Sequence, residues 1–303
     1  MKKFISIYIL LLICVYFDVQ SQSHIRVNNY WDNVYSMNPA SINNAYFGTL
    51  TTAVRKQWIN FPGSPTLMFA TGTLYLENYY TQLGMKILME KKGYELTADI
   101  DLSYAYEVML RNDWFLNLGL SMSFQNHSYD ISQIRFEGSI IPSVYDRLLF
   151  ENNLNTDAGF ELNYHSWKFG GISHNLLSLF NDQNNLHINT NILYCFYRQQ
   201  NSDYLNLGIG LSAFQYTNIY QAEINLTGFF KKTTETNPFQ IGVFYRTWRE
   251  MGMIFGIEMD DYKIYYSCDY NFGQFYRHSF GSHEIMLIYN FSRSYKCRNC
   301  WWY

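Results

Sequence analysis

The residues best suited to chemistry in this sequence are four charged side chains that interrupt apolar segments. Arg55, Arg246, Asp269 and Glu284 each lie in a stretch where apolar and polar residues alternate. A charge that a fold removes from water is costly unless it is paired, so such charges either satisfy one another or serve a function. We favour mutual pairing over a docking role for a plug or a partner protein.

Catalytic and cofactor signals are weak. His283-Glu284 lacks the second histidine of a zinc-protease helix. Asp99 and Asp101 would share one face of a strand, but that is ordinary polarity for a wet face. No serine, histidine or cysteine stands at a spacing that implies a nucleophile and its base. We therefore expect no catalytic residues and no cofactor, and a protein that is not an enzyme.

The cysteines give little more. Cys195 and Cys268 are single strand residues, which we place on the polar and the apolar face of their strands, respectively. Cys297 and Cys300 form one Cys-x-x-Cys pair, whereas a zinc site of this kind requires two. We favour a disulfide in an oxidising compartment over a metal site.

The elements that must position these residues are strands with one apolar face. Leu116, Leu118, Leu120, Met122 and Phe124 alternate with Asn117, Gly119, Ser121 and Ser123. Successive side chains of a strand point to opposite faces, so this pattern predicts a sheet that is apolar on one side and polar on the other. The pattern recurs along nearly the whole chain, and no second layer is available to cover the apolar side. A membrane covers it if the sheet closes, so the predicted fold class is all-β, a transmembrane antiparallel β-barrel.

The N-terminus is a targeting segment. Lys2 and Lys3 precede the uncharged apolar run 4–17, and Ser21 follows at a position suited to signal peptidase. The predicted signal peptide is therefore residues 1–21. No later stretch reaches the ~20 apolar residues of a membrane-spanning helix, and the net charge of −3 argues against a nucleic-acid partner.

About fourteen strands fit the remaining sequence, an even number as in bacterial barrels. We expect a periplasmic or lumenal lead-in at 22–45, the barrel at 46–292 and a tail at 293–303. The predicted strands are 46–60, 66–76, 79–90, 93–109, 113–126, 156–165, 167–175, 186–199, 203–215, 219–231, 238–248, 251–260, 262–272 and 281–291. The longest connections are odd-numbered along the chain, so they lie at the same end of the barrel. Long loops are typical of the outer end, which places both chain ends in the periplasm.

The polar face predicts the lumen. Asp99, Asp101 and Glu107 face inward, but so do Met286 and Ile288. A wide channel would be more uniformly polar, so we expect a narrow lumen filled by side chains, a loop or the lead-in.

Closure also places charges together. A closed barrel pairs the first strand with the last, so Arg55 and Glu284 should be neighbours near the outer strand ends. Arg246 and Asp269 should face inward at the same level.

An aromatic and proline-rich cluster marks the first outer connection, comprising Trp58, Phe61, Pro62, Gly63 and Pro65. It is either an aromatic belt followed by a rigid turn or an exposed apolar surface for another protein. The sequence leaves these two interpretations nearly even.

An ordered set of short motifs resembles the PorP/SprF family, outer-membrane proteins of the type IX secretion system in Bacteroidetes. The set is Asn38-Pro39-Ala40, Arg55-x-Gln57-Trp58, Pro62-Gly63-x-Pro65, Tyr104-Ala105-Tyr106, Gly171-Ile172-Ser173-x-Asn175-Leu176, Tyr245-Arg246, Asp269-Tyr270 and Ser282-His283-Glu284-Ile285. Asn44 and Ala45 stand where the family often has Ala-Gly, and the tail with Cys297 and Cys300 is not typical of it.

The resemblance implies a barrel that binds, helps to export or anchors a secreted cargo, including gliding adhesins, at the cell surface. The implied partners are a cargo with a C-terminal sorting domain, other type IX components and outer-membrane lipids. Motif residues that would contact a partner are Asn38, Pro39, Gln57, Trp58, Pro62, Pro65 and His283. The alternatives are an outer-membrane transporter of hydrophobic small molecules, which needs an apolar path through the lumen, and a lipid hydrolase, which needs a Ser–His pair.

Overall fold

The computed structural model describes residues 27–111, 113–129, 150–179, 189–200, 202–216, 219–231, 238–247, 249–272 and 279–292. The predicted signal peptide and the predicted tail with Cys297 and Cys300 lie outside these residues.

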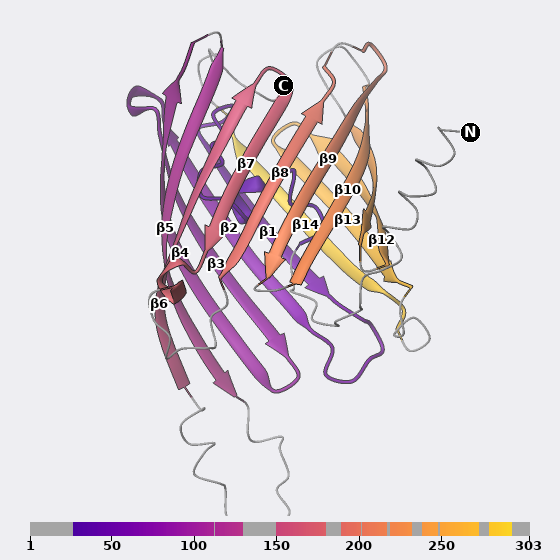
Figure 1. Ribbon diagram of the computed structural model, residues 1–303. Coiled ribbons are helices and arrows are strands. Elements are labelled where there is room, and N and C mark those ends of the chain that lie inside the picture. Colours follow the sequence, from indigo (N-terminus) through magenta and orange to yellow (C-terminus); the bar gives the residue numbers. More distant parts are fainter. Residues whose placement is uncertain are drawn as a thin grey trace, which may run out of the picture.

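Within the described chain, fourteen antiparallel strands close into a barrel, which confirms the predicted fold class (Figure 1). The strands are β1 (Gly48–Lys56), β2 (Thr66–Leu76), β3 (Thr81–Lys92), β4 (Glu95–Met109), β5 (Trp114–Tyr129), β6 (Phe150–Tyr164), β7 (Trp167–His174), β8 (Thr190–Arg198), β9 (Leu205–Tyr216), β10 (Ile219–Phe230), β11 (Phe239–Arg246), β12 (Glu250–Met259), β13 (Tyr262–Asn271) and β14 (Ser282–Phe291). Three short 3-10 helices accompany them, η1 (Val34–Ser36), η2 (Glu77–Tyr79) and η4 (Leu176–Leu179).

The barrel closes between its first and last strands. The register of β1 on β14 runs from Gly48 opposite Phe291 to Lys56 opposite His283. Every other strand pairs with its neighbours in sequence. Closure leaves no sheet edge, so the strand backbones are satisfied without water, as a bilayer requires.

The two faces of the wall differ as the alternation predicts. In β5, Asn117 is fully buried, whereas Leu118 and Leu120 are 49% and 62% exposed on the outside. Outward apolar side chains of this kind recur on every strand from β1 to β14. A soluble protein rarely exposes more than a few hundred Å² of continuous apolar surface, so hydrocarbon is the solvent that fits this face.

The two ends of the barrel are distinguished by their connections. At one end β1 finishes at Lys56 and β14 begins at Ser282, and the widest gap between paired strands, 130–149, also falls there. We call it the long-loop end, and it lies at the bottom of Figure 1. At the other, the terminal end, β1 begins at Gly48 and β14 finishes at Phe291.

Aromatic side chains gather at the terminal end. Trp114 stacks on Tyr164 with ring centroids 4.4 Å apart, and Tyr262 lies 4.6 Å from Tyr289. Such belts mark the interface between hydrocarbon and water. Among the described residues, the helices are single short turns, and none has the length or apolarity to span a bilayer.

Two strand features differ from the sequence prediction. β5 extends to Tyr129 and β6 begins at Phe150, so the predicted connection 126–155 is partly strand. Cys195 lies on the outward parity of β8, not the polar inner face, because the inner face of β8 carries Tyr194 and Phe196, which are both 4% exposed. Cys268 is on the outward parity of β13, as predicted.

Candidate functional site

The lumen is occupied by the chain's own N-terminal segment, residues 27–47, which includes the described part of the predicted segment 22–45 and which we call the lead-in. It runs from Asn28 at the long-loop end of β13 and β14 to Phe47, whose N–H joins the sheet at Phe291 O, 3.0 Å away. Asn28, Tyr30 and Asn38 are 0% exposed. Among the described residues, the lead-in and the inward side chains of the wall fill the lumen, as two of the three expected candidates.

Tyr30 anchors the first part of the lead-in to strands β8, β9 and β10. Its ring lies 6.0 Å from Phe214 and 6.2 Å from Phe196, centroid to centroid. Its hydroxyl donates to Glu223 Oε1 at 2.8 Å and lies 2.8 Å from Ser212 Oγ. A buried tyrosine with its hydroxyl satisfied combines a large apolar contact with a directional bond.

Arg55 centres the first half of a buried charge cluster at the long-loop end. Its guanidinium lies 2.8 Å from Asp269, 3.6 Å from Glu284 and 3.9 Å from Glu250. The predicted neighbours Arg55 and Glu284 are therefore observed as a pair in register.

Arg246 centres the other half. It forms an ion pair with Glu223 through Nε and lies 3.2 Å from Glu250 through Nη1. Glu250 thus touches both arginines and links the halves. All four predicted charges belong to one cluster, and Glu223 and Glu250 complete it.

Asn28 of the lead-in lies at the centre of this cluster. Its backbone N–H donates to Glu284 Oε2 at 2.7 Å, and its side-chain amide donates to Asp269 Oδ2 at 2.7 Å. Its amide oxygen accepts from Arg246 Nη2 at 2.9 Å. One asparagine therefore satisfies two carboxylates and one guanidinium, each from a different strand.

The charges in the cluster do not cancel. Two arginines face four carboxylates, Glu223, Glu250, Asp269 and Glu284. The hydrogen-bond donors of Asn28 and Tyr30 offset part of the formal excess of carboxylates, so the lead-in contributes partners that the wall of the barrel does not supply.

Asn38-Pro39-Ala40 fixes the middle of the lead-in. The Asn38 amide donates to Phe160 O at 3.0 Å and to Tyr194 OH at 2.9 Å, while its oxygen accepts the N–H of Ala40 at 2.9 Å. Tyr194 in turn donates to Glu161, which pairs with Lys168 at 3.1 Å.

Two glycines make room for this motif. A Cβ on Gly119 would lie 2.3 Å from the Ala40 nitrogen, and one on Gly159 would lie 2.1 Å from the Asn38 amide oxygen. Both distances are far below any van der Waals contact, so only glycine permits the lead-in to press against β5 and β6.

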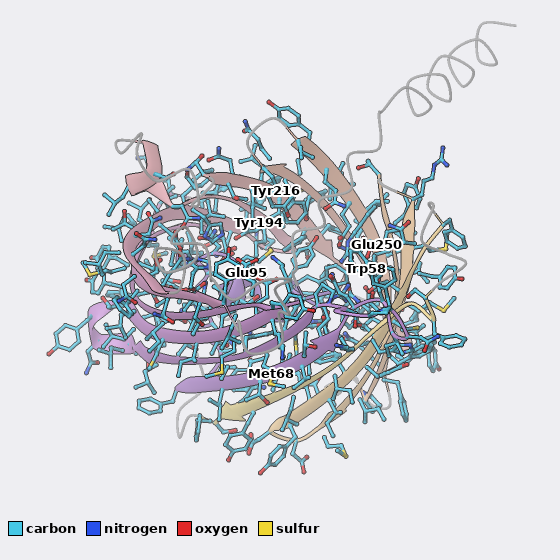
Figure 2. The ribbon with its side chains drawn as sticks, turned by 90° about the horizontal axis from the view of Figure 1, so that it is seen from below. Trp58, Met68, Glu95, Tyr194, Tyr216 and Glu250 are labelled. Atoms are coloured by element: carbon cyan, nitrogen blue, oxygen red, sulfur yellow. The ribbon has the colours of Figure 1, made fainter. Side chains whose placement is uncertain are left out.

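The first long-loop connection forms an aromatic rim. The Trp58 and Phe61 rings meet edge to face with centroids 6.4 Å apart, and Pro62 is exposed. Ile59 N–H donates to Gly281 O at 2.9 Å and Phe280 N–H to Ile59 O at 3.0 Å, which ties this connection to the one before β14. Figure 2 looks onto this end of the barrel, where Trp58 and Glu250 are labelled.

A cavity of about 200 Å³ lies beside the lead-in, in the long-loop half of the lumen. Strands β3 to β7 contribute a polar wall, formed by Lys86, Asp99, Asp101, Ser123, Gln125, Asp157 and His174. Apolar side chains of β2, β3, β8 and β9 flank it, namely Leu67, Phe69, Leu88, Ile192, Phe214 and Tyr216. The lead-in also lines the cavity, through Val27, Ser36 and Met37. Figure 2 shows Tyr194 and Tyr216 on the inner wall and Met68 pointing outward.

Comparison with known proteins identifies the family. The family model described as type IX secretion system membrane protein PorP/SprF matches residues 19–289. The chain belongs to the PorP/SprF family. No curated protein matches it significantly.

Solved structures with a similar fold include two hydrocarbon channels and a toluene transporter. A TodX mutant described as a monoaromatic hydrocarbon channel has TM-score 0.53 and 8% identity, covering 90% of this chain and 96% of its own. The toluene transporter TbuX of Ralstonia pickettii has a TM-score of 0.51 and 8% sequence identity, and the match covers 85% of this chain and 93% of TbuX. CymD, a monoaromatic hydrocarbon channel, has a TM-score of 0.51 and 10% identity, and the match covers 86% of this chain and 93% of CymD. At these identities the likeness shows the fold alone, and with the family it identifies an integral outer-membrane protein.

Several PorP/SprF motif residues lie where the lead-in meets the wall. Asn38 is 0% exposed and Pro39 is buried, so neither offers surface to another protein. Gln57 is 3% exposed and Pro65 is buried. Trp58 and Pro62 remain accessible at the rim.

His283 stands apart from both groups. It lies on the outward parity of β14, where its Nδ1 is 2.5 Å from the Tyr266 hydroxyl. It is not in the charge cluster, although its sequence neighbour Glu284 is.

Asn28, Glu223 and Glu250 are the members of the site that sequence reasoning missed. Parity could have found Glu223 and Glu250, since both lie on inward positions near the long-loop ends of their strands. Asn28 carries no comparable signal, because the lead-in has no periodic pattern.

Proposed function

We propose that this protein is an outer-membrane binding partner for a secreted cargo of the type IX system, which it helps to export or anchors at the cell surface. Its contact face is the long-loop end, with the rim around Trp58 and Phe61 and the cavity inside it. Binding alone accounts for this role, so we propose no catalytic activity.

The observation that carries the proposal is the occupied lumen. The lead-in is held by Asn28 in the charge cluster, by Tyr30 on strands β8, β9 and β10 and by Asn38 against β5 and β6. A barrel whose lumen is filled by its own N-terminal segment is a rigid platform that presents a shaped surface at the long-loop end. It is poorly suited to passing a folded or unfolded polypeptide through its centre.

We propose that the long-loop end faces the outside. Bacterial barrels have short periplasmic turns and longer outer loops. Gly48 and Phe291 then face the periplasm, and the lead-in crosses the lumen from the outer half to the inner half. A periplasmic position of the chain's first residues stays a prediction, since residues 1–26 are outside the described chain.

Transport of hydrophobic small molecules is the second candidate. The apolar side chains that flank the polar wall of the cavity favour it, and the three similar structures named above carry such descriptions. Between the cavity and the terminal end, however, the lumen contains Asn33 and Asn38, which are both buried. An apolar ligand would have to pass these amides, so we rank transport below partner binding.

Deletion of the gene tests the proposal in cells that secrete type IX cargo. We expect one cargo to disappear from the cell surface, measured by surface proteomics, while the other cargo proteins stay at wild-type levels. Complementation with the wild-type chain should restore it. Loss of every type IX substrate would contradict a cargo-specific role and indicate a part in the common machinery.

A further inference from the structure

The cavity beside the lead-in is lined by hydrogen-bond acceptors to which no described group donates. Asp99 Oδ1, Ser123 Oγ and Gln125 Oε1 have no hydrogen-bond partner among the described residues. All three side chains line the cavity, and Ser123 is only 3% exposed. Buried polar atoms normally find partners, so a cluster of this kind needs an explanation.

The three side chains lie close together on adjacent strands. Asp99 of β4 is directly opposite Gln125 of β5, and the Gln125 amide donates to Asp99 Oδ2 at 3.3 Å. Ser123 lies two positions from Gln125 on the same inward face, opposite Asp101. Directly opposed and i, i+2 positions are about 5–7 Å apart, which is within the reach of one ligand group.

Asp99 is also the unpaired charge of the cavity. Lys86 pairs with Asp101 at 2.6 Å, and His174 pairs with Asp157 at 3.1 Å. Asp99 makes no ion pair with any described residue. The described residues of the polar wall therefore offer one carboxylate without an ion pair and two neutral acceptors, and both cationic side chains among them, Lys86 and His174, are already paired.

Apolar side chains flank this polar wall. Leu67, Phe69 and Leu88 come from β2 and β3, with Leu88 directly opposite Asp99, and Ile192 and Phe214 come from β8 and β9. A ligand that fills the cavity must present several donors and a positive charge to the polar wall and apolar groups to its flanks. A guanidinium fits the polar wall best because it carries five N–H donors in a planar fork.

We propose that the cavity binds an arginine side chain of the cargo, with a neighbouring apolar side chain packed against the apolar residues that flank the polar wall, such as Phe69 and Phe214. Asp99 takes the guanidinium charge, and Ser123 and Gln125 accept its remaining N–H groups. This inference rests on the proposed function, since it names the chemistry by which the long-loop end recognises the cargo.

The test is a calorimetric titration of the purified full-length barrel in lipid nanodiscs. The probe is the peptide acetyl-Leu-Arg-Phe-amide, and its comparator carries citrulline, the neutral isostere, in place of arginine. We expect binding of the arginine peptide and at least about tenfold weaker binding of the citrulline peptide.

Variants of the barrel localise the effect. Asp99→Asn should weaken the arginine peptide at least about tenfold, since it removes the charge and keeps the shape. Asp203→Asn makes the same charge change on an exposed residue between β8 and β9 at the terminal end, and should leave binding unchanged. An unchanged thermal unfolding midpoint verifies that Asp99→Asn is folded.

The outcomes are separable. Equal binding of the two peptides, or unaltered binding to folded Asp99→Asn, overturns the site. Binding of N-acetylarginine methylamide as tight as that of the peptide assigns the cavity to a free guanidinium compound and overturns the assignment to the cargo. Capture of the cargo that Asp99→Asn leaves intact overturns this site while the proposed function stands. Failure of the wild-type barrel to capture any secreted protein overturns the proposed function, and the titration still decides whether the cavity binds a guanidinium.

Discussion

Asn28 and Glu284 are joined by a hydrogen bond of 2.7 Å from a backbone N–H to a carboxylate, although 256 positions separate them in sequence. The same carboxylate lies 3.6 Å from Arg55 on the adjacent strand. One carboxylate thus links the lead-in, the first strand of the barrel and the last strand. The same side chains hold the lead-in in the lumen and join the two strands that close the barrel, which makes the cluster the first target for mutation.

Arg55→Met should destabilise the barrel strongly. It leaves Asp269 and Glu284 without their arginine, and removing one partner of a buried ion pair costs about 3–5 kcal/mol. The free energy of unfolding in detergent micelles, from a urea titration followed by tryptophan fluorescence, measures this. Lys263→Met is the control, since it removes a more exposed pair with Glu258 and should cost about 1 kcal/mol or less. Equal losses in the two variants would contradict the importance of the cluster.

Gly119→Ala should loosen the lead-in. The new methyl group would lie 2.3 Å from the Ala40 nitrogen, and such overpacking costs about 1–3 kcal/mol. Single-channel recordings in planar bilayers should show higher conductance than the wild type, because the lead-in no longer seats in the lumen.

Gly72→Ala is the matched control for that measurement. A Cβ there has no atom within 4 Å, so the conductance should stay at the wild-type value. A closed, non-conducting Gly119→Ala barrel of normal stability would show that the contact with Asn38-Pro39-Ala40 does not keep the lumen shut.

Cys195 and Cys268 test which face meets the membrane. In a variant with Cys297→Ser and Cys300→Ser, both thiols should resist a water-soluble maleimide in intact membranes and react after denaturation, because they point into hydrocarbon. A Tyr204→Cys thiol at the exposed terminal end should react at once, since Tyr204 is 82% exposed. Rapid labelling of Cys195 in the native barrel would place it in an aqueous lumen and contradict the observed parity of β8.

Phe61→Ser and Phe280→Ser should weaken cargo capture without affecting folding. The two aromatic rings are 37% and 72% exposed at the rim, and exposed substitutions usually change stability by less than about 0.5 kcal/mol. Loss of two aromatic anchors should lower the affinity for the cargo at least about tenfold in a binding titration. Tyr204→Ser removes a comparable ring at the opposite end and should have no effect.

The alternation in the sequence predicts the wall of this barrel because hydrocarbon enforces it. Leu118 and Leu120 must face outward, and the order of the strands then brings Arg55 beside Glu284. Strand ends beyond the membrane are not constrained in this way. The polar segment 126–129 therefore reads as a connection, although it continues β5.

The contacts of the lead-in could not be predicted for a different reason. The inner face of β8 is aromatic because it packs against Tyr30, so its two faces look alike in the sequence and the alternation predicts the wrong face for Cys195. The position of Asn28 depends on side chains from β11, β13 and β14. Such contacts follow from the assembled wall and leave no local pattern.

Purification of the native barrel from detergent-solubilised outer membranes, with mass spectrometry of everything that accompanies it, tests the central claim most directly. We predict one secreted protein with a C-terminal sorting domain in near-equimolar amount, and its loss when the rim variant Phe61→Ser, Phe280→Ser is purified in the same way. Recovery of the folded barrel with fatty acids or aromatic hydrocarbons and no secreted protein would contradict a role in cargo binding.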